Sequence, residues 1–86
     1  MADPALDPDA KTLLDAILQD LPFFVRGQAR TATVEEAVKQ ARAAGSPSVT
    51  REGVVRAMVA ITPTHMKAQL KALLAKKGVD TTSYFK

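Results

Sequence analysis

The feature that most constrains the fold is a helical stripe near the start of the chain, which a proline cuts off. Asp7 and Pro8 stand where an N-cap and a first helical residue belong. Pro22 disfavours helical geometry at the residue before it, so it ends or redirects the helix. Between these signals, apolar residues recur at the i, i+3, i+4 spacing of an amphipathic helix. They are Ala10, Leu13, Leu14, Ile17, Leu18 and Leu21.

The next segment, residues 22–44, predicts a long helix whose continuity the sequence leaves open. It is expected to start at Pro22 or Phe23 and to end at Ala44, before Gly45. Thr33 followed three residues later by a glutamate fits a capping box. The segment therefore forms either one helix or two that meet near residues 30–33.

Two further helices are expected in the second half of the chain. Thr50 is a good N-cap for the third, with Glu52 in its first turn. Thr62 and Pro63 repeat the cap-and-proline signal before the fourth, which Gly78 closes. The inward faces are predicted to be Val54, Val55, Met58 and Val59 in the third helix, and Met66, Leu70, Leu73 and Leu74 in the fourth.

These patterns predict an all-α fold, a small bundle of about four helices with a C-terminal tail. No run of residues predicts a strand, and 86 residues give room for one core. We expect residues 1–6 to be a flexible leader, residues 7–60 a helical domain, and residues 61–86 a C-terminal helix and tail.

Composition and charge exclude several classes of protein. The chain has no cysteine, which excludes a disulfide framework, a thiolate metal site and a cysteine nucleophile. No apolar run approaches the roughly 20 residues of a membrane span, and the acidic, proline-containing start is unlike a signal peptide. A cytoplasmic location is therefore expected. Residues 1–20 carry five aspartates and one lysine, a net charge of −4, whereas residues 21–86 carry +7, from eleven basic and four acidic side chains.

The segment from Leu21 to Arg30 concentrates the side chains that look functional. Phe23 and Phe24 are adjacent in a chain with only two other aromatic residues. Neighbours on a helix cannot both face one core. Either a non-helical turn buries both rings, or one ring is buried between the first two helices and the other is a hydrophobic staple or an exposed anchor for a partner. Stacking of a ring on a base or a pigment is a further alternative.

The arginines of this segment leave three alternatives open. Arg26 and Arg30 lie one helical turn apart, so both guanidinium groups can reach one anion. Gly27 beside them removes a side chain and permits close approach. The anion is a carboxylate of a partner protein, or a phosphate or propionate of a small molecule. Alternatively, the two arginines pair inside the chain with Asp15, Asp20 or Glu36.

The same residues carry a resemblance to a known family. The sequence resembles the small C-terminal helical domain found in light-independent protochlorophyllide reductase, a domain that also occurs as short independent chains. The sequence departs from the family pattern in two ways. The interval between the arginine pair and the following glycine is longer by about one helical turn. Thr31 and Gln40 replace a basic and an aromatic residue of the pattern. The matching positions are Leu21 to Gly27, Arg30, Ala41-Arg42, Gly45 and Val49-Thr50.

The resemblance implies a non-catalytic accessory module that docks on a larger complex. The reductase's iron–sulfur clusters and nitrogenase-like core have no counterpart here, so no cofactor is expected. The partner implied is a tetrapyrrole enzyme of chlorophyll biosynthesis or another photosynthetic assembly. The partner-binding residues are predicted to be Phe23, Phe24, Arg26, Gly27 and Arg30, with Tyr84 and Phe85 of the tail.

Two other functions stay open as alternatives. The second and third helices, with the short link between them, fit a helix-turn-helix that would present Arg51 and Arg56 to nucleic acid, with Lys67 and Lys71 on phosphates. The isolated chain could also bind a tetrapyrrole directly, but the single His65 has no companion ligands at helical spacing. Neither a catalytic triad nor a glycine-rich phosphate loop is present in the sequence, so an enzyme is not expected.

Overall fold

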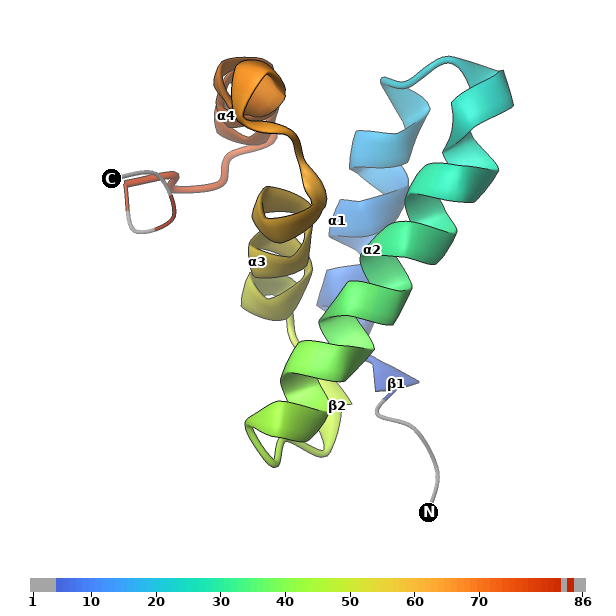
Figure 1. Ribbon diagram of the computed structural model, residues 1–86, viewed down its shortest axis with the longest axis vertical. Coiled ribbons are helices and arrows are strands. Elements are labelled where there is room, and N and C mark those ends of the chain that lie inside the picture. The colour runs from blue at the N-terminus through green and yellow to red at the C-terminus, as the bar shows by residue number, and fades with distance from the viewer. Residues whose placement is uncertain (1–4, 83, 85–86) are drawn as a thin grey trace.

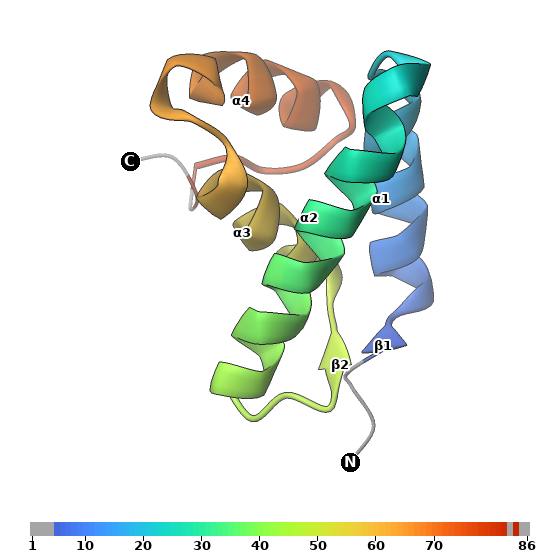
Figure 2. The ribbon, with the colours of Figure 1, turned by 45° about the vertical axis from the view of Figure 1, so that its right-hand side comes forward.

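The computed structural model describes residues 5–82 and 84, and it confirms the prediction of a small all-α domain. In chain order, the elements are β1 (Ala5–Leu6), α1 (Pro8–Gln19), α2 (Phe23–Ala43), β2 (Ser48–Val49), α3 (Arg51–Ile61), the 3-10 turn η1 (Thr64–Met66) and α4 (Lys67–Lys76). The helices α1, α2 and α3 lie side by side, and α4 crosses the end of this group at which α1 passes into α2 (Figures 1 and 2).

The second helix is continuous, which answers the question of one helix or two. α2 runs without interruption from Phe23 to Ala43, through the proposed break. Thr33 does not cap a new helix but lies inside α2, with only 2% of its surface exposed. It continues the buried line of Ala37 and Ala41 at intervals of four residues, and this line packs α2 against the core. Burial of that face outweighs the local capping signal.

A short parallel ribbon corrects the prediction for the start of the chain. Ala5 and Leu6, which we expected in a flexible leader, pair with Ser48 and Val49. The backbone N–H of Asp7 extends the ribbon by donating to the carbonyl of Val49 over 2.9 Å. Strands of two residues are too short to show an alternating pattern, which is why the sequence did not predict them. Residues 1–4 of the leader lie outside the described part.

The core combines leucine and valine side chains with several small residues. Leu14, Val54 and Leu74 are fully enclosed, so α1, α3 and α4 all contribute to one core. Alanines let the helix backbones approach closely where they cross, since they bring no bulk to the contact. The buried apolar residues are Ala10, Leu13, Leu14, Ile17, Leu18, Ala37, Ala41, Val49, Val54, Val55, Ala57, Met58 and Leu74.

The last helix begins later than predicted, and one of its residues is misplaced. Thr50 caps α3 as expected, accepting a hydrogen bond from the backbone N–H of Gly53 at 3.1 Å. After Pro63, however, the chain forms the 3-10 turn η1 before α4 starts. This tighter turn changes the facing of Met66, which was expected inside the core but is 43% exposed. Leu74 reaches the core as predicted.

We expect Leu14→Ala to lower the free energy of unfolding by about 2–5 kcal/mol, because it leaves a cavity among side chains that are already close-packed. Urea denaturation of the full chain measures this. Ile61→Ala is the control: that side chain is 38% exposed, and its loss is expected to cost about 1 kcal/mol or less. Equal losses in the two variants would contradict the described core.

Candidate functional site

Arg26 binds the end of the preceding helix. Its Nε lies 3.0 Å from the carbonyl oxygen of Leu18 and 2.9 Å from that of Leu21. Its Nη2 lies 2.9 Å from the carbonyl oxygen of Gln19. The last carbonyls of a helix have no partner within the helix, and Pro22 supplies no N–H. The guanidinium of Arg26 therefore caps α1 from the first turn of α2.

Arg30 pairs inside the chain as well. Its Nη2 forms an ion pair with Oδ1 of Asp15 on α1. Both side chains are partly exposed, at 46% and 40%, so the pair contributes little to stability. Arg26 and Arg30 line one shallow hollow, but Asp15 lines it too. The structure thus favours the internal-pairing alternative for these arginines over a fork that grips an external anion.

Phe23 and Phe24 lie almost entirely in solvent. Their exposed fractions are 80% and 72%, so the alternatives that bury both rings, or one of them between the first two helices, are wrong. The rings touch edge to face, with centroids 5.8 Å apart and planes at 87°. The reason for their exposure is periodicity. The buried line of Thr33, Ala37 and Ala41, extended backwards by four residues at a time, passes through positions 29 and 25 and misses both phenylalanines.

Gly27 leaves bare backbone next to the rings. A β-carbon built at this position meets no atom within 4 Å outside the neighbouring residues and the backbone of α2, so among the described residues no other segment lies against the glycine. Gly27 lies three positions after Phe24, on the same side of α2. The expected close approach at Gly27 is therefore open to another molecule, beside two exposed rings.

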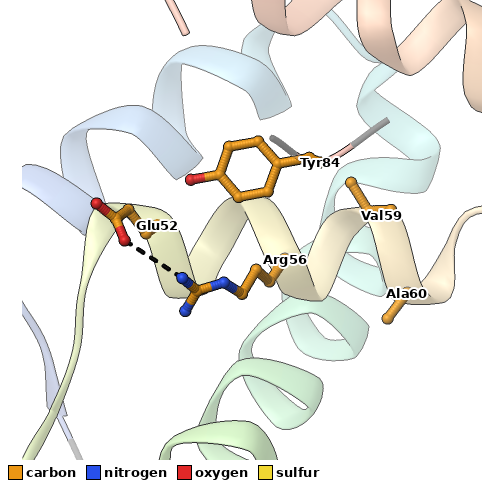
Figure 3. A pocket seen from close by; sticks show the side chains of 5 residues that line it. All are labelled: Glu52, Arg56, Val59, Ala60 and Tyr84. Carbon is orange, nitrogen blue, oxygen red and sulfur yellow. Dashed lines mark hydrogen bonds and ion pairs between the residues drawn. The ribbon is translucent and has the colours of Figure 1, made fainter. Parts of the chain in front are cut away.

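Tyr84 lies against its own chain. Figure 3 shows its ring over α3, with Glu52, Arg56, Val59 and Ala60 around it. Its backbone N–H donates to the carbonyl of Thr81 over 3.1 Å, which closes a turn in the tail. Tyr84 thus belongs to a surface separate from that of Phe23 and Phe24. Phe85, the other aromatic residue predicted in the tail, lies outside the described residues.

A neighbouring carboxylate helps to shape this tail. Asp80 accepts a hydrogen bond from the backbone N–H of Thr82 over 3.0 Å. This hydrogen bond lowers the pKa of Asp80 below its usual value. The group is fully exposed, so the interaction orders the tail locally without contributing to the core.

The basic residues of the nucleic-acid alternative do not form one continuous surface. Arg51 stands at the start of α3, whereas Lys67 and Lys71 are on α4 at the other end of the molecule (Figures 1 and 2). Nη2 of Arg56 lies 3.3 Å from Oε2 of Glu52, and Arg56 lines the hollow under Tyr84. On α3, the helix that would enter a groove in DNA, Arg56 is therefore paired with Glu52, and the ring of Tyr84 lies over the same side.

His65 and the acidic residues offer no metal site in the described part of the chain. His65 is exposed in η1, and no group of three or more histidine or acidic side chains comes together among the residues described. No described helix is long and apolar enough to cross a membrane.

An apolar hollow that the sequence did not predict lies between α4 and the other helices. Its volume is about 240 Å³, and no charged side chain lines it. The hollow depends on where η1 places α4, which no local pattern reveals. The residues that line it are Ile17, Leu18, Leu21, Ala29, Thr33, Met58, Ile61, Thr62, Met66, Gln69, Leu70 and Leu73.

Comparison with known proteins gives no relative for this arrangement. No family model, no curated protein and no solved structure matches the chain. The chemistry of the site is therefore argued from its geometry.

The roles of the two arginines are separable by mutation. We expect Arg26→Met to lower the free energy of unfolding by about 1–3 kcal/mol, because three carbonyl oxygens lose a charged donor. Arg30→Met removes only an exposed ion pair and is expected to cost less than about 1 kcal/mol. Urea denaturation of both variants measures the difference. A larger loss at Arg30 would contradict the capping role of Arg26.

Proposed function

We propose that this protein is a non-catalytic helical module that docks on a larger protein complex through Phe23 and Phe24. The observation that carries the proposal is the exposure of both rings, 80% and 72%, at the start of a long helix. Exposed aromatic residues that touch each other and no core are typical of interface anchors.

The energetics favour a protein surface as the partner. Burying a phenylalanine side chain fully is worth about 1.5–3 kcal/mol, and two adjacent rings bury together in one step. The edge-to-face contact and the helix hold the rings in place before binding, so little conformational entropy is lost. Gly27 exposes backbone beside them, which lets a partner approach closely.

The contact we propose is apolar. Arg26 and Arg30 are engaged with α1, so they add little attraction for an acidic partner. Binding should therefore depend weakly on salt, unlike the steep salt dependence of nucleic-acid binding. This distinguishes the proposal from the nucleic-acid alternative without any knowledge of the partner.

We infer the kind of complex from the resemblance to the protochlorophyllide reductase domain. The partner is a cytoplasmic tetrapyrrole enzyme or another assembly of a photosynthetic or nitrogenase-like system. In this proposal the chain itself binds no cofactor and carries out no chemistry. Its part is to dock, with Phe23 and Phe24 at the centre of the contact.

The docking residues are testable in native extract. We expect the full chain to migrate with a high-mass complex, and Phe23→Ser/Phe24→Ser to reduce the bound fraction at least tenfold with the free energy of unfolding unchanged. The physical reason is that both rings are exposed and contribute nothing to the core. Met66→Ser, at another exposed apolar residue, is the matched control and should bind normally.

A photo-crosslinking benzophenone side chain at position 24 identifies the partner directly. The same group at Ala75, an exposed position on α4, controls for random contact. Equal cross-linking from both positions would contradict the proposal, as would a loss of binding when salt is raised from 50 to about 500 mM.

A further inference from the structure

The apolar hollow under α4 has the size and chemistry to hold an aromatic ring. Its volume is about 240 Å³, and an apolar cavity of about 150 Å³ is enough to bind benzene. Leu18 and Leu70 line it from α1 and α4, and Met66 and Ile61 stand at its exposed side. Since no charged side chain lines it, an apolar group enters without leaving a charge buried and unpaired.

The rings of the same chain cannot fill this hollow. Ala29 lines it from α2, and Phe24 and Phe23 come five and six positions earlier on that helix. At 3.6 residues per turn these positions lie about 140° and 120° away from Ala29 around the helix axis. The rings therefore point away from the hollow of their own chain, although the start of α2 and α4 lie at the same end of the molecule (Figure 1).

We propose that the hollow binds one ring of the Phe23–Phe24 pair of a second copy of this chain, with the other ring against its rim. The structure presents two exposed phenyl rings and, on a different face of the molecule, an uncharged cavity large enough for one of them. Arg26, the cation that follows the rings in the sequence, is held by the carbonyls of α1, so it does not oppose the contact. The inference depends on the proposed role of the rings as a contact surface, and it identifies what covers them when the larger complex is absent.

The proposed contact is head to tail and weak. A ring of one copy occupies the hollow of the next, whose own rings stay free, so the association can continue beyond two copies. An aromatic side chain buries about 150–250 Å². Counting two rings and both sides, the contact covers at most roughly 600–1,000 Å², which is below the range of stable interfaces. Self-association is therefore reversible, and a docking partner that binds the same rings displaces it.

Two complementary variants test the contact. Phe23→Ser/Phe24→Ser removes the rings and keeps the hollow, whereas Met66→Glu places a charge at the exposed side of the hollow and keeps the rings. The average mass of the full-length wild type is expected to rise steadily between about 20 μM and 1 mM in sedimentation equilibrium. Each variant alone should stay monomeric, and an equimolar mixture should form a dimer and nothing larger.

The controls separate this inference from the proposed function. Ala75→Glu adds the same charge to α4 away from the hollow and should associate like the wild type. Met66→Glu should still bind the larger complex, because its rings are intact. A wild type that stays monomeric at 1 mM, or a mixture that forms no dimer, overturns the self-association and leaves the docking proposal standing. Loss of complex binding in Met66→Glu would instead contradict the assignment of docking to the rings.

Discussion

The corner between the first two helices depends on one guanidinium group. Arg26 binds the carbonyl oxygens of Leu18 and Gln19 in the last turn of α1 and that of Leu21 just beyond it, next to a proline that has no N–H to donate. This capping sets the position of the first turn of α2 relative to α1. The placement of the two phenylalanines that precede Arg26 at this corner follows from it.

The two apparent halves of the candidate site thus have different roles. Both arginines are engaged within the chain at the corner: Arg26 binds carbonyl oxygens and supports the fold, whereas Arg30 forms an exposed ion pair with Asp15 that adds little stability. The rings contribute nothing to the core and are left on the outside. A segment that looks like one mixed cationic and aromatic surface in the sequence divides into an internal support and an external contact. The apolar character of our proposed docking follows from this division.

Sequence reasoning was sufficient where the signals are local and periodic. The start of α1 at Pro8, the N-cap at Thr50 and the buried stripe of α1 follow directly from helix chemistry. The sequence alone was insufficient where tertiary packing decides which side chains are buried. Thr33 looks like a cap but is buried in the seam of α2, and Met66 leaves the core because of a 3-10 turn. The carbonyl partners of Arg26 were not predicted, since every residue has a backbone oxygen and the sequence does not mark which of them an arginine binds.

The two-stranded ribbon bears on how the domain assembles as it is made. The ribbon ties residues near the start of the chain to Ser48 and Val49, beyond the whole of α2. During translation, β1 and the apolar stripe of α1 leave the ribosome well before β2 and α3 are available to cover them. The nascent chain therefore passes through a stage in which the leucines of α1 lack their native cover. Native closure of the domain waits until its middle segment arrives.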